Sequence, residues 1–194
     1  AFGATLFDAS GKVILDQNSG AADFLAWMQA LAASGGSFVD TDYGMLIDRF
    51  KKGEFAYFVD GPWAIAELRA ALGDNLSVLP LPAGPAGPAQ PWVNAEGVVI
   101  SPVISEQQAL NAWWLATHLT DAAAGSTFAS VAGRLPANQR AALPEDPILR
   151  GFAAQAATAQ PAPSQKEMDA VWGYGGDMLL KVLGGSMEPA AAVQ

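Results

Sequence analysis

A run of prolines and glycines between residues 80 and 91 constrains the fold of this chain most. The run reads Pro-Leu-Pro-Ala-Gly-Pro-Ala-Gly-Pro-Ala-Gln-Pro and holds five prolines and two glycines. Proline fixes φ and lacks a backbone N–H, so this segment can form neither a helix nor a central strand. We expect a connector here, with a boundary between two parts of the chain.

Hydrophobic periodicity predicts both strands and helices before the connector. Expected in order are a β-hairpin over 4–15, a helix between Ser19 and Gly35, a helix capped near Thr41-Asp42, a strand over 55–59, a helix over 63–72 and a strand over 77–81. The mixture predicts an α/β fold, and the chain looks like one that starts inside a fold.

The part after the connector is predominantly helical. A strand is expected over 93–100, and Ser105-Glu106-Gln107-Gln108 forms a capping box for the next helix. Two further helices are expected to start at Asp121 and at Pro147, the second of them continuing through Ala159. The last helix is expected to start at a second capping box, Ser164-Gln165-Lys166-Glu167, and to end at Gly184-Gly185.

Composition excludes several classes of protein. The 194 residues are 51% hydrophobic and 15% charged, which is typical of a globular protein and not of a disordered one. The net charge of −9 repels nucleic-acid backbones. Because there is no cysteine and His118 is the single histidine, disulfides, thiolate catalysis and the usual zinc sites are excluded. No cofactor or metal is expected.

Trp63 follows a Gly61-Pro62 turn at a predicted junction between a strand and a helix. Ligands of α/β proteins usually bind at such junctions, so the ring can be a stacking platform, although core packing is the first explanation of this segment taken alone. Three other aromatic residues also lie at element boundaries or beside glycines: Tyr43, Trp92 and Trp172. Aromatic faces stack on the C–H faces of sugar rings.

Two carboxylates, Asp60 and Glu96, flank predicted strand ends and could in principle serve glycoside hydrolysis. Asp60 beside a Gly-Pro turn is also explained as a turn residue or as an acceptor for ligand hydroxyls. Asp40-Thr41-Asp42 is explained first as a helix cap and second as a calcium site. Trp113 and Trp114 lie in the middle of a helix, as core or interface residues.

Several motifs resemble, in their order and spacing, the C-terminal half of a family 1 extracellular solute-binding protein. This family includes the maltose and maltodextrin-binding proteins of ABC importers. The motifs are Thr41-Asp42-Tyr43, Lys52-Gly53-Glu54, Asp60-Gly61-Pro62-Trp63, the connector, residues 97–101 and Val171-Trp172-Gly173-Tyr174. The resemblance covers nearly the whole chain, and residues 41–63 are its most specific part.

The resemblance implies a helix-rich, periplasmic-binding-protein-like (type II) lobe without catalysis. It implies an oligosaccharide ligand, an ABC importer permease as partner and a periplasmic or cell-surface location. By similarity, Trp63 and Trp172 stack on sugar rings and Tyr43 contacts the sugar, while Trp92, Asn94 and Glu96 are further candidates. Maltose binders often have a second tryptophan where this chain has Ile65, a departure from the maltodextrin pattern.

The resemblance also implies an incomplete fold that lacks the first, N-terminal lobe. Residues 1–88 would begin the second lobe, residues 89–134 would hold the connector and the segment that crosses the hinge to the first lobe, and residues 135–194 would return to the second lobe. Without partners, residues 92–132 would expose Trp113 and Trp114 and could mediate dimerisation or swapping.

Two alternatives to sugar binding stay open. One is a glycoside-processing enzyme that uses Asp60 and Glu96. The other is a protein-interaction module that uses the face of Trp113 and Trp114.

Overall fold

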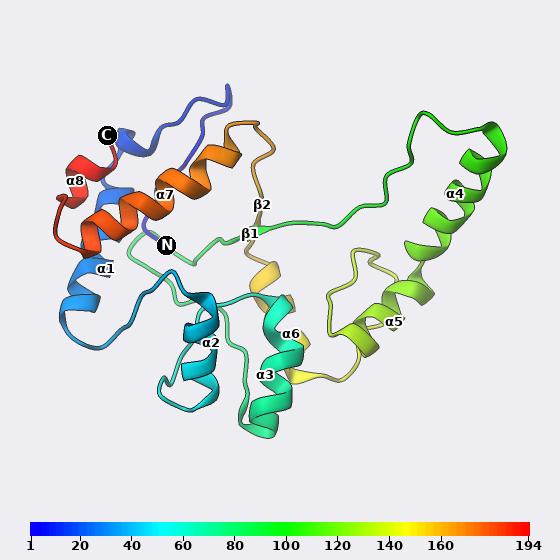
Figure 1. The fold of residues 1–194 in the computed structure, drawn as a ribbon, viewed down its shortest axis with the longest axis horizontal. Helices are drawn as coiled ribbons and strands as arrows, with labels where there is room; N and C mark the ends of the chain where they lie inside the picture. The colour runs from blue at the N-terminus through cyan, green and yellow to red at the C-terminus, as the bar shows by residue number, and fades with distance from the viewer. The chain divides into compact units, whose positions relative to one another are not determined.

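Segments far apart in the sequence come together in two units. The computed structural model describes all 194 residues. The first unit consists of residues 1–43, 81–92 and 160–194, and the second of residues 44–80 and 93–159. Figure 1 shows the ribbon from the blue N-terminus to the red C-terminus. The connector therefore belongs with both ends of the chain, although it lies in the middle of the sequence.

The first unit is built around three helices: α1 (Gly20–Ala33), α7 (Met168–Leu183) and α8 (Pro189–Ala192). Helix α1 packs against both α7 and α8. Leu25 of α1 and Val182 of α7 are fully buried. In addition, Gln29 Nε2 donates a hydrogen bond of 2.9 Å to the carbonyl oxygen of Val182. The two ends of the sequence are thus held together by apolar burial and one polar contact between helices.

The second unit contains the other five helices. They are α2 (Tyr43–Lys51, whose first residue belongs to the first unit), α3 (Ile65–Leu72), α4 (Glu106–Leu119), α5 (Ala122–Ala132) and α6 (Pro147–Ala156). One core cluster joins Ile65, Ala129, Ile148 and Leu149, and a second joins Ile47, Ala64 and Leu68. Leu76 packs against both clusters, so α2, α3, α5 and α6 share continuous apolar contacts.

Three helix starts with side-chain caps lie where the sequence predicted helices to begin. Ser105 and Gln108 form the reciprocal capping box of α4, and the Asp121 carboxylate accepts a hydrogen bond from the Ala124 N–H at the start of α5. Asp146 caps α6 in the same way, with Pro147 at the first helical position. The second predicted box is wrong: α7 begins after Glu167 without a side-chain cap, and the Met168 N–H bonds the Gln165 carbonyl instead. Helix α6 also ends at Ala156, three residues before the predicted end.

The predicted strands are mostly absent. Strand β1 (Trp92–Val93) pairs with β2 (Gln160–Pro161), and the predicted strand over 93–100 extends no further. The hairpin over 4–15 is reduced to one antiparallel bridge between Phe7 and Val13. No strand forms over 77–81. A strand needs a neighbour for its backbone groups, and here the neighbours are missing.

Residues 55–59 also form no strand, and their packing explains why. Phe58 stacks on Phe50 of α2 with ring centroids 5.4 Å apart, and the Arg49 guanidinium lies 4.7 Å from the centre of the Phe55 ring. The side chains of Tyr57 and Val59 are exposed. The segment is therefore anchored on a helix by two aromatic rings and not by a β-ladder.

Short 3₁₀ turns complete the structure at Leu15–Gln17, Pro62–Ala64 and Gly73–Asn75. None of the helices has both the length and the apolar character that a membrane span requires.

Candidate ligand-binding site

The first unit brings two predicted site residues into contact. Trp92 begins β1 directly after the connector, and Trp172 is the fifth residue of α7. Their ring centroids are 5.8 Å apart with an interplanar angle of 88°, so the edge of one ring meets the face of the other. Trp172 remains 68% exposed and Trp92 39% exposed. The pair therefore presents two perpendicular aromatic surfaces to solvent, an arrangement that can stack on one sugar ring and flank another.

Three glycines surround Trp172 along α7: Gly173, Gly175 and Gly176. An added Cβ at any of them would meet nothing within 4 Å. Glycine inside a helix costs stability relative to alanine, and no other part of the chain approaches these positions closely enough to require it. The glycines leave the surface beside the Trp172 ring open.

In the second unit, Trp63 lies in the 3₁₀ turn that leads into α3. The next residues, Ala64 and Ile65, are buried in the core. Trp63 itself is 63% exposed, which excludes core packing as its role. Its six-membered ring lies directly over Gly61, where a Cβ would come within 2.3 Å of two ring carbons. Because Gly61 has no side chain, the Trp63 ring can lie against the Gly61 backbone, and the rest of the ring stays exposed to solvent.

Ile65 occupies the position where the sequence resemblance implies a second tryptophan in many maltose binders. The side chain is 5% exposed and packs with Ala129, Ile148 and Leu149. It is a core residue that anchors the start of α3. Only one aromatic surface is therefore available at this turn.

Asp60 closes the turn in front of Trp63. Its Oδ1 accepts a hydrogen bond of 2.7 Å from the Gly61 N–H, and the residue is partly buried. Asn94 and Glu96 follow β1 in an exposed stretch without regular structure. Tyr43 is the exposed first residue of α2. Among the predicted site residues, Tyr43, Trp92 and Trp172 belong to the first unit, and Asp60, Trp63, Asn94 and Glu96 to the second.

One ion pair fixes the helix that follows Trp63. Arg69 of α3 donates from Nη2 to Asp146 Oδ2 at 2.7 Å, and Asp146 is also the N-cap of α6. Burial tends to raise the pKa of the Asp146 carboxyl, but the hydrogen bonds from Arg69 and from the Ile148 N–H outweigh burial, and the pKa lies below its ordinary value. One carboxylate thereby joins the ends of two helices.

The remaining candidates have local roles. The Asp42 N–H donates to Asp40 Oδ1 at 2.9 Å, which is the geometry of a turn before a helix. No group of three histidine, cysteine or carboxylate side chains is placed to hold a metal ion.

His118 lies in the last turn of α4, largely exposed, with Nδ1 3.3 Å from Asp121 Oδ2. The Asp121 pKa is lowered, first by the Ala124 N–H and then by His118.

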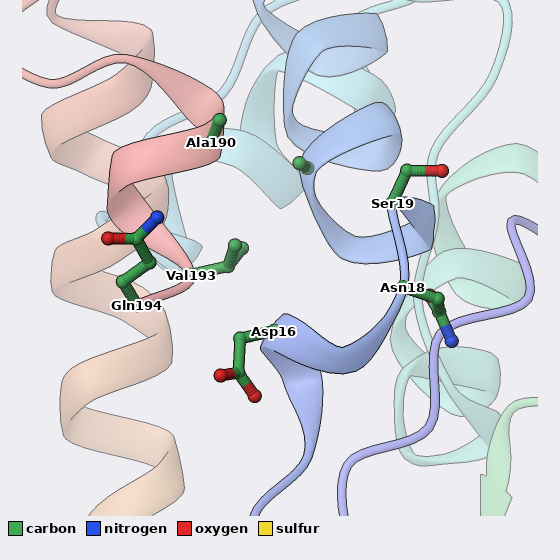
Figure 2. Close-up of a pocket in the computed structure, with 7 residues that line it drawn as sticks. Asp16, Asn18, Ser19, Ala190, Val193 and Gln194 are labelled. Carbon is green, nitrogen blue, oxygen red and sulfur yellow. The ribbon is translucent and has the colours of Figure 1, made fainter.

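A depression of about 550 Å³ lies near the start of α1 and the end of α8. Figure 2 shows Asp16, Asn18 and Ser19 on one side and Ala190, Val193 and Gln194 on the other. None of the predicted site residues lines it, and it contains no aromatic ring. The sequence gives no signal for this depression, because Asn18 and Ser19 are common residue types at a helix start.

A family model described as bacterial extracellular solute-binding protein matches residues 1–160. The comparison with curated proteins found no match. Among solved structures, the chain is similar to the maltose/maltodextrin-binding domain of Bdellovibrio bacteriovorus bound to maltotriose. That match has 25% identity and a TM-score of 0.79, and it covers 99% of this chain and 52% of that chain.

Two further solved structures match at lower identity and show the same fold. The maltose-binding periplasmic protein of Listeria monocytogenes, in complex with maltose, has 22% identity and a TM-score of 0.82 over 99% of this chain and 52% of that one. The GacH receptor of Streptomyces glaucescens, solved unliganded and with acarbose, has 22% identity and a TM-score of 0.81 over 98% of this chain and 51% of that one. The match over nearly the whole chain confirms the predicted helix-rich, periplasmic-binding-protein-like fold. The chain spans about half the length of these proteins.

Proposed function

The chain belongs to the bacterial extracellular solute-binding protein family, and we propose that it contributes one part of an oligosaccharide-binding cleft. The observation that carries the proposal is the perpendicular, solvent-exposed pair formed by Trp92 and Trp172. The similarity to a maltodextrin-binding domain bound to maltotriose supports a ligand of the same class.

The proposed chemistry follows from the side chains present. Sugar rings offer apolar C–H faces to Trp172, Trp92 and Trp63, which lose little conformational freedom on binding because each ring has only two rotatable bonds. Sugar hydroxyls need acceptors and donors, which Asp60, Asn94 and Glu96 can supply, and Tyr43 offers a ring with a hydroxyl. Contacts of this kind select a hydroxylated, uncharged ligand.

We place this chemistry within a transport protein. In a two-lobe binding protein, a ligand held by both lobes favours the closed form, and a membrane permease of an ABC importer recognises that form. This chain would supply the second lobe, with residues 89–134 reaching toward a complementary first lobe. Members of an extracellular family act outside the cytoplasm, and we propose the periplasm or the cell surface as the location.

The positions of Asp60 and Glu96 favour ligand binding without catalysis. Asp60 bonds its own neighbouring N–H, and Glu96 is exposed in an irregular stretch. A glycosidase general acid instead needs an apolar pocket, and the second carboxyl must face it across the scissile bond. Chromogenic glycosides test this point, since turnover that disappears in Asp60→Asn or Glu96→Gln would contradict the binding function.

The proposal is tested directly by a sugar panel. Maltose, maltotriose and acarbose would be titrated into the chain, with tryptophan fluorescence and calorimetry as readouts, beside an amino acid and a peptide as controls. We expect a response to the oligosaccharides only. Because half of a two-lobe cleft is available, affinity in the millimolar range is expected, about −4 kcal/mol. A response to the amino acid or the peptide but to no sugar would defeat the proposed ligand class.

A further inference from the structure

The connector contains a closed turn a short distance before Trp92. Gly84 and Gly87 pair as an antiparallel bridge, and each N–H donates to the carbonyl oxygen of the other glycine, at 2.9 and 3.1 Å. Four residues, Pro-Ala-Gln-Pro, separate this turn from Trp92. Two of the four are prolines with a fixed φ, so the link is stiff. The position of the turn therefore limits where the Trp92 ring can lie.

The turn is fixed by the backbone of the N-terminal segment, residues 1–4. The Ala86 N–H donates a hydrogen bond of 2.9 Å to the carbonyl oxygen of Ala1. A Cβ on Gly84 would lie 2.5 Å from that same oxygen and 2.8 Å from the carbonyl carbon. Gly84 does not have a positive φ, so glycine is required here for space and not for backbone conformation. Alanine at residue 84 needs either the connector or the N-terminal segment to move.

The opposite side of the N-terminal segment lies against the first turn of α1. Gly20 is buried, and a Cβ there would lie 2.4 Å from the Phe2 carbonyl oxygen and 2.6 Å from the Ala4 nitrogen. Asn18 Nδ2 donates to the Gly3 carbonyl oxygen at 3.3 Å, and Asn18 Oδ1 accepts from the Gly20 N–H at 2.9 Å. The segment is therefore enclosed between α1 and the connector, with a glycine on each side that permits the close approach.

These contacts link the two stacking tryptophans by a route separate from their own ring contact. Helix α1 packs against α7, which carries Trp172, and the connector leads directly into Trp92. The N-terminal segment, which contacts both α1 and the connector, thus sets the spacing between the two supports of the pair. A ligand surface that is already ordered loses less conformational freedom when a ligand binds.

We propose that Gly20 and Gly84 are positioning residues for the Trp92 and Trp172 pair. By admitting the N-terminal segment between α1 and the connector, they hold Trp92 against Trp172 before any ligand arrives. Neither glycine contacts the ligand in this role. The effect on the pair itself needs no ligand, whereas the effect on sugar affinity rests on the proposed function.

The test is ¹⁹F NMR of the chain with its six tryptophans labelled as 5-fluorotryptophan. Trp92→Ala and Trp172→Ala assign the two resonances, and each variant also shows where the remaining resonance lies without its partner. In Gly84→Ala and in Gly20→Ala, both resonances should move at least halfway toward these unpaired positions. Because the two variants act on opposite sides of one segment, either is a sufficient test if the other does not fold.

Maltotriose affinity should fall about threefold in each glycine variant, because the pair is then no longer ordered in advance. The double variant should lose less than the product of the two single losses, since both glycines act through the same segment. Calorimetry on the two single variants and the double variant measures this.

Gly151→Ala is the matched control. A Cβ on Gly151 would lie 2.4 Å from the Val78 carbonyl oxygen, which is a clash of the same kind but in the second unit. This variant should lower the free energy of unfolding as the other two do and leave the resonances of the pair in place. Trp113 and Trp114 of α4 supply reference resonances. They are 55% and 67% exposed, so they are not core residues of this chain.

Three results would overturn the positioning role. Unshifted resonances in the folded Gly84→Ala and Gly20→Ala variants would show that the pairing of β1 with β2 alone places Trp92. Equal shifts in Gly151→Ala would show a general loosening of the fold. Shifted resonances with unchanged maltotriose affinity would show that the geometry of the pair does not affect binding. If wild type bound no sugar while the resonances moved as expected, the proposed function would fail and the positioning of Trp92 would stand.

Discussion

The six-membered ring of Trp63 fills the space where a side chain at residue 61 would lie. Two of its carbons are 2.3 Å from the position of a Cβ on Gly61. The Gly61 backbone has φ −115° and ψ 178°, which any residue can adopt, so the requirement for glycine is one of space and not of backbone conformation.

Gly61→Ala should therefore displace the Trp63 ring without disturbing the backbone. Because the ring is mostly exposed, it can rotate toward solvent, and the free energy of unfolding should fall by less than about 1 kcal/mol. Oligosaccharide affinity should fall about as much as in Trp63→Ala, roughly tenfold. Calorimetry on both single variants and the double variant checks this. If the losses of oligosaccharide affinity from Gly61→Ala and Trp63→Ala were additive in the double variant, Gly61 would act independently of the Trp63 ring.

Substitution by alanine should change the free energy of unfolding in opposite directions at two helical glycines, Gly151 and Gly176. Gly151 of α6 faces Val78, whose carbonyl oxygen would lie 2.4 Å from an added Cβ, whereas a Cβ at Gly176 of α7 meets nothing within 4 Å. Gly176→Ala should stabilise the chain by about 0.5–1 kcal/mol through helix propensity. Gly151→Ala should destabilise it by about 1–3 kcal/mol through overpacking. Urea unfolding measures both, and a gain of stability in Gly151→Ala would show that the segment around Val78 is not packed as described.

The Asp146 carboxylate should make the free energy of unfolding decrease as the pH becomes acidic. Its pKa is lower in the folded chain than its ordinary value of 3.8, so the unfolded chain binds the proton more readily. Stability from this group is fully present above the unfolded pKa and is lost as pH falls through it toward the folded pKa. Asp146→Asn keeps a helix cap but removes the charge, so it should reduce the loss of stability below about pH 4. Thermal unfolding from pH 3 to 7 measures this.

The variant Arg69→Met tests whether the ion pair with Arg69 is a cause of the lowered pKa of Asp146. It removes the guanidinium that bonds Asp146 and leaves the Ile148 N–H in place. The acid-dependent loss of stability should become smaller than in wild type but larger than in Asp146→Asn. An Arg69→Met profile identical to wild type would show that the helix cap alone lowers the Asp146 pKa.

The helices and three of their capped starts could be predicted from this sequence, whereas the capping box before α7 and most of the strands could not. Ser105, Asp121 and Asp146 act on backbone groups two or three residues away, so local sequence is enough to locate them. The predicted strand over 55–59 carries the right residue types, but a strand also requires a neighbour, and Phe55 and Phe58 pack on α2 instead. Pairing partners lie far away in sequence, and periodicity contains no information about them.

The candidate site shows the same division between local and distant information. The Gly-Pro turn before Trp63 and the glycines beside Trp172 are visible in the sequence, but the exposure of Trp63, which decides between stacking and core packing, is known only from the fold. The contact between Trp92 and Trp172 joins residues eighty positions apart, and only the fold reveals it. Ile65 illustrates the converse, since an aliphatic residue at a presumed ligand position proves to be part of the core.

The most direct test of the central claim is a calorimetric titration of maltotriose into wild type, Trp172→Ala and Trp27→Ala. Both variants remove an exposed tryptophan from a helix of the first unit, and Trp27 is 46% exposed where Trp172 is 68% exposed. We predict that Trp172→Ala weakens binding by about tenfold, or ~1.4 kcal/mol, and that Trp27→Ala binds like wild type. Equal affinity in all three proteins, or a loss confined to Trp27→Ala, would contradict a sugar site at the Trp92 and Trp172 pair.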